Sequence, residues 1–226
     1  MIADDGGLMV DNFSSCYVPR EIRLIHPQKG TGKTIFEAPN PIKEFKTGSW
    51  KLFTIKNGQG ADLYCRLFRP VDFDSTKKYP VLVYLYNGPH SQMVTNTWMA
   101  NGELWYQYMA QKGFIVFTLD GRGTNWRGKA WEQAIFRQIG TVEMEDQLKG
   151  VEYLKSLPYV DASRIGVHGW SYGGFMTTSL MTRHPDVYKV GVAGGPVIDW
   201  SYYEVMYGER YMDRPEENKQ GYETNN

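Results

Sequence analysis

The chain has 226 residues, with 25 basic and 25 acidic side chains and a hydrophobic fraction of 42%. This length fits one large domain, or one domain with part of another, and the hydrophobic content is enough for a buried core. The zero formal net charge gives no electrostatic basis for binding nucleic acid or an anionic membrane surface. No apolar stretch approaches the length of about twenty residues that a membrane-spanning helix needs. The two cysteines, Cys16 and Cys65, have no metal or redox spacing and fit two free thiols as well as a disulfide.

Residues 1–40 have the pattern of short β-strands joined by turns. Residues 8–10 and 21–25 are strand-like, and the glycines within residues 29–33 are typical of a hairpin tip. The segment Pro39-Asn40-Pro41 interrupts this pattern, so we place a domain boundary there. Because forty residues of hairpins cannot bury a core alone, we interpret them as the last blade of a larger β array.

The strands expected after this boundary change in character along the chain. Residues 50–55 and 63–68 alternate apolar and polar side chains, and Asn57-Gly58 between them marks a hairpin. Residues 79–86 and 114–119 are instead almost continuous apolar runs. Such runs are typical of central strands in a parallel sheet that is covered on both faces.

Helical segments alternate with these strands. The spacing of apolar residues predicts helices over residues 98–112 and 142–157, and a third that starts near Gly174 and ends near Pro185. One more strand is expected at residues 190–193, and the polar tail from residue 214 is expected to be a loop or frayed. The order predicts a doubly wound, mostly parallel α/β sheet with an antiparallel N-terminal edge.

A nucleophile motif lies between an apolar strand at residues 164–168 and the third helix. Residues 169–174 read Gly-Trp-Ser-Tyr-Gly-Gly, which contains the Gly-x-Ser-x-Gly pattern of α/β-hydrolases. That pattern places a serine on a very tight strand-to-helix turn, and glycines on either side allow the backbone to take this shape. The motif alone can arise by chance as a glycine-rich turn. Strand, turn and helix nevertheless follow in the required order, so we interpret Ser171 as a nucleophile.

The serine needs a histidine base and an acid, and in this fold both follow it along the chain. His26, His90 and His168 all precede Ser171. His184 lies only thirteen residues after it, on the helix that leaves the turn, and fits a polar residue at a helix C-terminus. We therefore expect this sequence to be a segment of a longer protein that ends before the acid and base. The sheet would be incomplete, and the isolated chain would be nearly inactive.

Other motifs agree with the nucleophile motif. Four further segments carry motifs that belong with it: Tyr86-Asn87-Gly88-Pro89, residues 120–124, residues 140–147 and residues 200–212. Together they resemble the dipeptidyl peptidase IV family within the prolyl oligopeptidase clan. The resemblance extends from about residue 50 to residue 215. It implies that residues 1–40 are the C-terminal end of a β-propeller and that residues 41–226 are the N-terminal part of an α/β-hydrolase catalytic domain.

The resemblance also implies roles for individual residues. Ser171 would attack the peptide carbonyl, while the Tyr86 hydroxyl and the Tyr172 backbone N–H would donate hydrogen bonds to the oxyanion. The pocket for the residue before the cleaved bond would be lined by Val197, Trp200, Tyr203 and Tyr207, whose spacing suits one short helix. Without the resemblance, the favoured interpretation of Tyr86 is a cap on a buried strand, and the spacing alone favours a core cluster for the aromatic residues.

The function implied is that of a serine-type dipeptidyl peptidase, which cleaves peptides after a penultimate proline or alanine through an acyl-enzyme. No metal or cofactor is expected, the partner is a peptide substrate, and the full-length protein would be an extracytoplasmic homodimer. Two alternatives stay open. One is a prolyl oligopeptidase, an acylaminoacyl peptidase or an esterase of the same clan. The other is a catalytically dead homologue that acts as a binding module.

Overall fold

The computed structural model describes residues 1–225, and within helix α1 (Met99–Gly102) the side chains of residues 101 and 102 lie outside that description. The chain forms two compact units. The first comprises Met1–Lys46 and Thr95–Trp105, and the second comprises Thr47–Val94 and Tyr106–Asn226. The predicted division into a propeller end and a catalytic domain stays a prediction. In the described part of the chain, no helix is long and apolar enough to cross a membrane.

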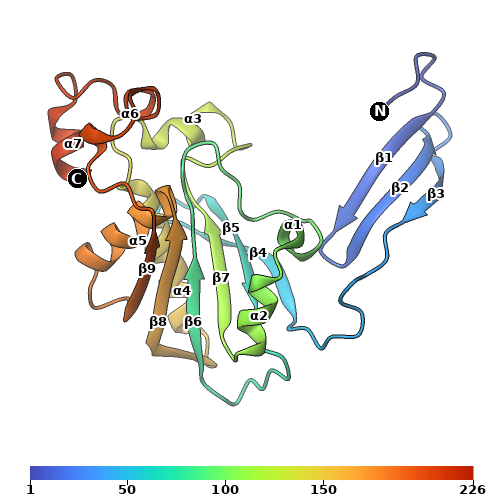
Figure 1. The fold of residues 1–226 in the computed structure, drawn as a ribbon, viewed down its shortest axis with the longest axis horizontal. Helices are drawn as coiled ribbons and strands as arrows, with labels where there is room; N and C mark the ends of the chain where they lie inside the picture. The colour runs from blue at the N-terminus through green and yellow to red at the C-terminus, as the bar shows by residue number, and fades with distance from the viewer. Residues whose placement is uncertain (226) are drawn as a thin grey trace. The chain divides into compact units, whose positions relative to one another are not determined.

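The first unit contains a three-stranded antiparallel sheet in the order β1-β2-β3 (Figure 1). Its strands are β1 (Met9–Ser15), β2 (Val18–His26) and β3 (Thr31–Glu37). The turn between β2 and β3 overlaps the predicted hairpin tip. None of residues 1–46 is buried, which agrees with the expectation that these hairpins cannot bury a core alone.

The second unit is built on a six-stranded sheet in the order β4-β5-β7-β6-β8-β9. The strands are β4 (Trp50–Lys56), β5 (Asp62–Phe68), β6 (Tyr79–Tyr84), β7 (Ile115–Asp120), β8 (Val160–Trp170) and β9 (Val190–Gly194). The pairs β4·β5 and β5·β7 are antiparallel, and the remaining pairs are parallel. The prediction of a mostly parallel α/β sheet with an antiparallel N-terminal edge is therefore confirmed.

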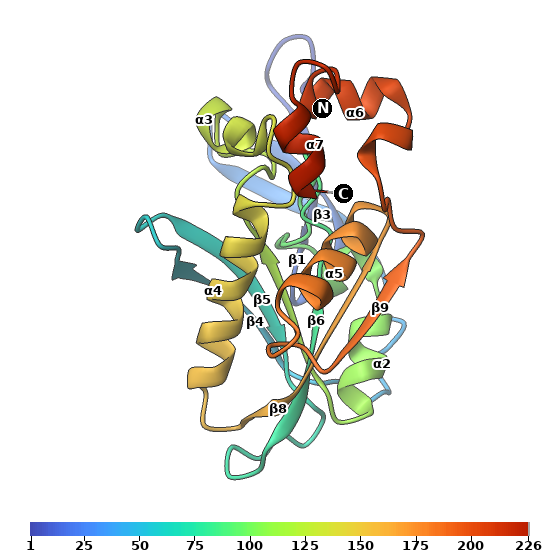
Figure 2. The same ribbon diagram turned by 90° about the vertical axis from the view of Figure 1, so that its left-hand side faces the viewer.

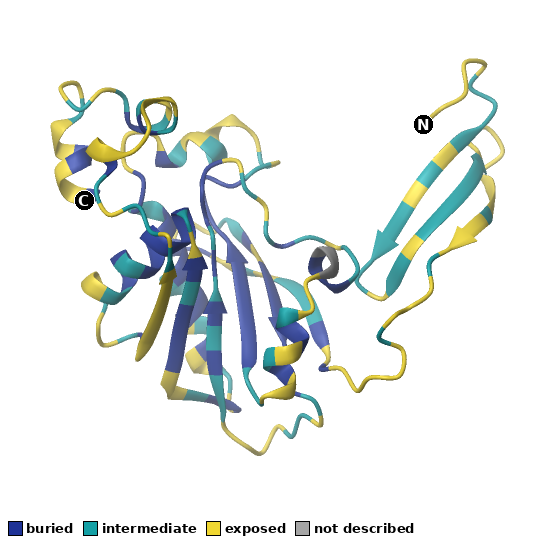
Figure 3. Cartoon of the chain, in the orientation of Figure 1, coloured by how far each residue is buried: buried dark blue, intermediate teal, exposed yellow. Residues whose placement is uncertain are grey.

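Helices cover both faces of this sheet. Figure 2 shows α4 (Val142–Ser156) and α5 (Tyr172–Arg183) on one face and α2 (Trp105–Gln111) on the other. Gly150 allows the close approach of α4, since a Cβ there would lie 2.8 Å from a ring carbon of Phe117. Tyr106 of α2 stacks on Phe68 with 5.2 Å between ring centroids. The central strands are the best-buried part of the molecule, and β7 is buried along its whole length (Figure 3).

The remaining helices are short and follow strand β7 or strand β9 along the chain. They are α3 (Lys129–Glu132), the 3₁₀ helices η1 (Gln133–Ile135) and η2 (Trp200–Tyr202), α6 (Val205–Met212) and α7 (Lys219–Asn225). Strand β9 stands at the end of the sheet order, and Val190 and Val192 are both more than half exposed. The strand predicted at residues 190–193 is therefore confirmed, and its two valines lie exposed at this edge of the sheet.

Two predictions of secondary structure were wrong. The single helix predicted over residues 98–112 is divided into α1 and α2, because Glu103 leaves the helical conformation with a ψ of 88°. The Glu103 carboxylate then accepts the Trp105 backbone N–H at 3.2 Å. The tail is also not frayed, since α7 buries Tyr222, whose hydroxyl donates to the Asp213 carbonyl at 2.9 Å. Tertiary contacts thus order a segment whose polar composition suggests a loop.

Candidate active site

The centre of the site is a sharp turn at Ser171, between β8 and α5. Ser171 has a φ of 57° and a ψ of −116°, a left-handed conformation that is uncommon outside glycine and strained for a serine. Its backbone N–H donates to the Gly194 carbonyl of β9 at 2.8 Å, which holds the turn against the sheet. Ser171 as a whole is only partly buried. This is the geometry of a nucleophile elbow.

The glycines that flank Ser171 are required by space. A Cβ at Gly169 would lie 2.4 Å from the Gly173 carbonyl oxygen and 2.5 Å from that of Leu85. A Cβ at Gly173 would lie 2.4 Å from the same Leu85 oxygen. Neither glycine has a positive φ in this structure. The sequence motif therefore reflects the convergence of three backbones, at the ends of β6 and β8 and the start of α5.

Tyr86 lies beside the nucleophile, just after β6. Burial and the nearby Tyr203 raise the pKa of the Tyr86 phenol, whereas interactions with Tyr207 and Ser171 lower it, so these side chains are its neighbours. The next residue, Asn87, has a φ of 58°, so the chain turns sharply away after Tyr86. The Tyr86 ring also packs on Tyr172, with 6.1 Å between centroids. The structure thus places Tyr86 near Ser171 and Tyr172, and the roles of these three residues stay a prediction.

Aromatic side chains form a wall next to this group. The ring centroids of Trp200 and Tyr207 are 5.8 Å apart in a stacked arrangement, and Tyr203 meets each of them edge-on at 5.5 and 5.6 Å. Trp200 is almost fully buried and contacts Tyr172 at 5.6 Å, whereas Tyr203 is 39% exposed. Val197 is partly buried against the same core.

The wall is not built as predicted, because it does not come from one short helix. Trp200 belongs to η2, Tyr207 belongs to α6, and Tyr203 stands between them in extended conformation. The Asp199 carboxylate accepts the Ser201 backbone N–H at 2.8 Å and begins η2. The chain then bends, which lets the rings face one another instead of lying in a stripe.

Sequence analysis did not identify the group that holds Tyr172. The Tyr172 hydroxyl donates to Glu143 Oε1 at 2.6 Å, and both residues are buried. Burial raises the pKa of Glu143 to about 7, against hydrogen bonds from Gly140, Tyr172 and Thr141 that lower it. Burial and the neighbouring Glu143 raise the pKa of Tyr172 well above its usual value. The sequence does contain a signal for Glu143, because residues 140–147 resemble a segment of the family. The resemblance assigned no role to that segment.

Two of the four histidines, His168 and His90, have side-chain contacts with other residues. His168 Nδ1 lies 2.8 Å from the Val192 carbonyl oxygen, and His184 follows the last turn of α5. His90 Nδ1 lies 3.7 Å from Glu132 Oε2. The expectation that the general base and acid come from elsewhere stays a prediction. Among residues 1–225, no group of three or more His, Cys, Asp or Glu side chains is placed to hold a metal ion.

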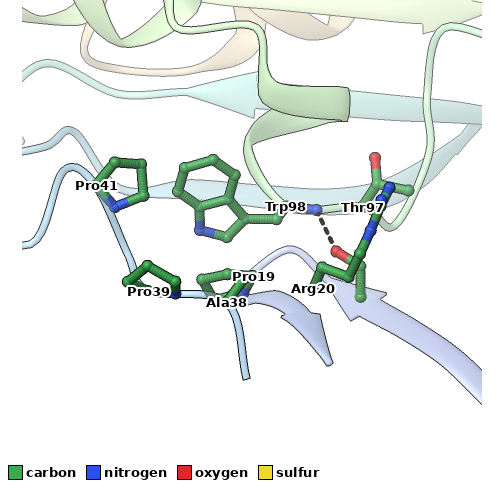
Figure 4. Close-up of a pocket in the computed structure, with 8 residues that line it drawn as sticks. Pro19, Arg20, Ala38, Pro39, Pro41, Thr97 and Trp98 are labelled. Atoms are coloured by element: carbon green, nitrogen blue, oxygen red, sulfur yellow. Dashed lines mark hydrogen bonds between the residues drawn. The ribbon is translucent and has the colours of Figure 1, made fainter. Parts of the chain in front are cut away.

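One pocket belongs entirely to the first unit. It has a volume of about 520 Å³, and the Trp98 ring lies between prolines in it (Figure 4). The Trp98 backbone N–H donates to Ser14 Oγ at 3.1 Å. The lining residues are Ser14, Pro19, Arg20, Ala38, Pro39, Pro41, Thr97 and Trp98. None of the predicted site residues lines this pocket, so it does not contribute to the candidate active site.

The chain also matches a known protein family and known sequences. The model of the prolyl oligopeptidase family matches residues 102–226. Dipeptidyl peptidase 8 of Mus musculus is 34% identical over 199 residues, which cover 88% of this chain and 22% of the relative. A probable dipeptidyl-aminopeptidase B of Ajellomyces capsulatus is 42% identical over 231 residues, which cover 98% of this chain and 24% of the relative. The chain thus spans less than a quarter of these relatives.

Solved structures show the same similarity. A putative dipeptidyl aminopeptidase IV from Bacteroides ovatus superposes with a TM-score of 0.94 and 52% identity, over 99% of this chain and 32% of that one. Dipeptidyl peptidase 4 of Porphyromonas gingivalis superposes with a TM-score of 0.90 and 33% identity, over 100% of this chain and 32% of that one. The likeness therefore covers both units of this chain and about a third of each solved chain.

Proposed function

This chain belongs to the prolyl oligopeptidase family, and from that premise we propose that it is the nucleophile-bearing part of a serine dipeptidyl peptidase. The observation that carries the proposal is the turn at Ser171, with the Tyr86 phenol and the Tyr172 amide next to it. The names of the similar proteins, dipeptidyl peptidase and dipeptidyl-aminopeptidase, support the same reaction class.

In the proposed reaction, Ser171 Oγ attacks the carbonyl carbon of the scissile peptide bond. The serine proton passes to a histidine base that we place outside this chain, and the carbonyl oxygen becomes an oxyanion. When the C–N bond breaks, the base returns the proton to the leaving amine, and water then hydrolyses the acyl-enzyme. The Tyr86 hydroxyl and the Tyr172 N–H donate hydrogen bonds to the oxyanion. Because burial raises the pKa of Tyr86, its phenol keeps its proton at neutral pH and can donate.

The aromatic wall gives the proposed substrate preference a physical basis. Tyr203 and Tyr207 offer flat apolar faces backed by the almost fully buried Trp200, and such faces suit a proline ring because that ring is small, apolar and without an N–H donor. Alanine would also fit, with less contact area. We therefore propose that the complete protein releases dipeptides whose second residue is proline or alanine. Homodimerisation and an extracytoplasmic location are carried over from the family resemblance as further proposals.

The test is hydrolysis of a chromogenic Gly-Pro anilide by the complete protein that contains this chain. We expect the wild-type protein to hydrolyse this anilide. The substitution Ser171→Ala should abolish the hydrolysis, and so should acetylation of the amino terminus of the substrate. Cleavage of the acetylated substrate at an equal rate would favour an acylaminoacyl peptidase or an endopeptidase instead. No hydrolysis of either substrate, in a protein that is folded, would support the catalytically dead homologue.

The 226-residue chain alone provides a second test. Without a base, Ser171 should react with a fluorophosphonate probe far more slowly than the serine of the complete protein, because removing a triad member costs about 10⁴ to 10⁶ in turnover. Rapid stoichiometric labelling of Ser171 in the isolated chain would show that this chain supplies its own base.

A further inference from the structure

Helix α4 buries three polar side chains, Glu143, Asp146 and Gln147, and the first and last of them lie one helical turn apart. Glu143 and Gln147 are 0% and 1% exposed, and their spacing of four residues puts them on the same face of the helix. Buried polar groups are usually bonded to a specific partner, because leaving one unpaired costs free energy. The partners of these two side chains both lie at the candidate active site.

Glu143 holds the residue that follows the nucleophile. Its Oε1 accepts the Tyr172 hydroxyl at 2.6 Å and the Gly140 N–H at 3.0 Å, and its Oε2 accepts the Thr141 N–H at 3.1 Å. The Tyr172 ring is fixed along its length as well, by edge contact with Phe175 at 5.3 Å. A side chain that is held at both its tip and its ring restricts the backbone of the same residue. That backbone carries the N–H that we assign to the oxyanion.

Gln147 holds the residue that follows the phenol. Its Nε2 donates to Asn87 Oδ1 and, at 3.0 Å, to the Leu119 carbonyl at the end of β7. Asn87 is almost fully buried and has the left-handed φ of 58°, which an asparagine adopts more readily than most residues. Its conformation sets the direction in which the chain leaves Tyr86. The bond from Gln147 therefore fixes the loop that carries the second proposed donor.

We propose that Glu143 and Gln147 are positioning residues that hold the two donors to the oxyanion, Glu143 through the Tyr172 side chain and Gln147 through Asn87. This inference rests on the proposed function for the identity of the donors. The inference also gives the segment at residues 140–147 a role, because this segment carries both Glu143 and Gln147 on one helix. Donors to an oxyanion act only when they are held in place before charge develops, so anchoring them on a helix serves the reaction directly.

The test uses the complete protein with the substitutions Glu143→Gln, Tyr172→Phe and Gln147→Leu. Tyr172→Phe keeps the ring and the backbone N–H and removes only the bond to Glu143. Glu152→Gln is the matched control, because Glu152 lies on the same helix, is largely exposed and pairs with Lys149 at 2.8 Å. Thermal melting of each variant shows that it is folded before its activity is compared.

We expect kcat for the Gly-Pro anilide to fall about tenfold to a hundredfold in the three variants, since small displacements of a catalytic group have effects of this size. KM should change little, because the three substitutions keep the Tyr172 ring and the aromatic wall and remove only contacts that position the oxyanion donors. Affinity for a peptidyl boronate, which forms a tetrahedral adduct on Ser171, should fall in parallel with kcat. Affinity for the product dipeptide should stay the same. Glu143→Gln combined with Tyr172→Phe should be no slower than the slower single variant.

Two results would overturn the inference while leaving the proposed function intact. One is a wild-type kcat and boronate affinity in folded Tyr172→Phe and Gln147→Leu. The other is an equal loss of affinity for the boronate and for the product dipeptide, because general damage to the site would have that effect. Inactivity of the wild-type protein would instead overturn the proposed function, and the inference with it.

Discussion

Replacing Glu143 by glutamine should remove a pH dependence from the stability of the fold. Burial raises the pKa of this carboxyl from an ordinary 4.5 to about 7, against the hydrogen bonds from Gly140 and Tyr172 that lower it. Because the folded state then holds the proton more tightly than the unfolded state, the unfolded chain ionises first as the pH rises. The contribution of Glu143 to stability is therefore fully present below about pH 4.5, and it is lost as the pH rises through about 7.

The size of the effect follows from the two pKa values. At about 1.4 kcal/mol for each pH unit, the interval from 4.5 to about 7 corresponds to roughly 3 kcal/mol in the free energy of unfolding. That is a large part of the stability of an ordinary domain, which is about 5–15 kcal/mol. The charged form accepts three hydrogen bonds, and these limit the rise of the pKa that burial causes.

The assay is urea unfolding followed by tryptophan fluorescence, at intervals from pH 4.5 to 8. The difference in unfolding free energy between the wild type and Glu143→Gln should change by about 3 kcal/mol across this range, since the glutamine does not titrate. Glu152→Gln, an exposed change on the same helix, should follow the wild type. If the unfolding free energies of the wild type and Glu143→Gln changed in parallel with pH, the reasoning that the buried Glu143 carboxyl has a raised pKa would be refuted.

Three further predictions concern the site and the sheet. Tyr86→Phe should lower kcat of the complete protein by about 10²–10³ with little change in KM, because one oxyanion donor is lost; an unchanged kcat would remove Tyr86 from the reaction. Tyr203→Ala should lower kcat/KM for proline substrates by an amount equivalent to about 1–3 kcal/mol, and an unchanged preference for proline over alanine would contradict the pocket assignment. In the 226-residue chain, Val192→Lys should reduce aggregation measured by light scattering, because Val192 is 56% exposed on the edge strand β9.

The sheet and the nucleophile turn could be predicted because their signals are local. Continuous apolar runs marked β6 and β7, alternating segments separated by Asn57-Gly58 marked the β4·β5 hairpin, and the motif at Ser171 followed a strand directly. Each of these signals depends on residues within a few positions of one another. Local patterns of this kind survive folding, because the element that they favour is also the one that the core can bury.

The errors came from segments whose structure is decided at long range. Helix α7 forms in a polar tail because Asn218 donates to the Arg137 carbonyl at 2.9 Å and Tyr222 is buried. The rings of Trp200 and Tyr207 meet only because the chain bends between η2 and α6. The role of residues 140–147 was hidden for the same reason. Glu143 and its partner Tyr172 are 29 residues apart, and no periodicity connects them.

The Tyr172 side chain contacts both parts of the proposed site, the oxyanion donors and the aromatic wall. Its hydroxyl is bound to Glu143, and its ring contacts both Tyr86 and Trp200. Under the proposed function, a substrate ring held by the aromatic wall is one ring contact, that between Trp200 and Tyr172, away from the backbone N–H that we assign to the oxyanion. Binding of the side chain before the cleaved bond and stabilisation of the transition state would then share this contact. A pocket that is well filled, as by proline, should then raise kcat as well as lower KM, because part of the binding energy is realised where charge develops.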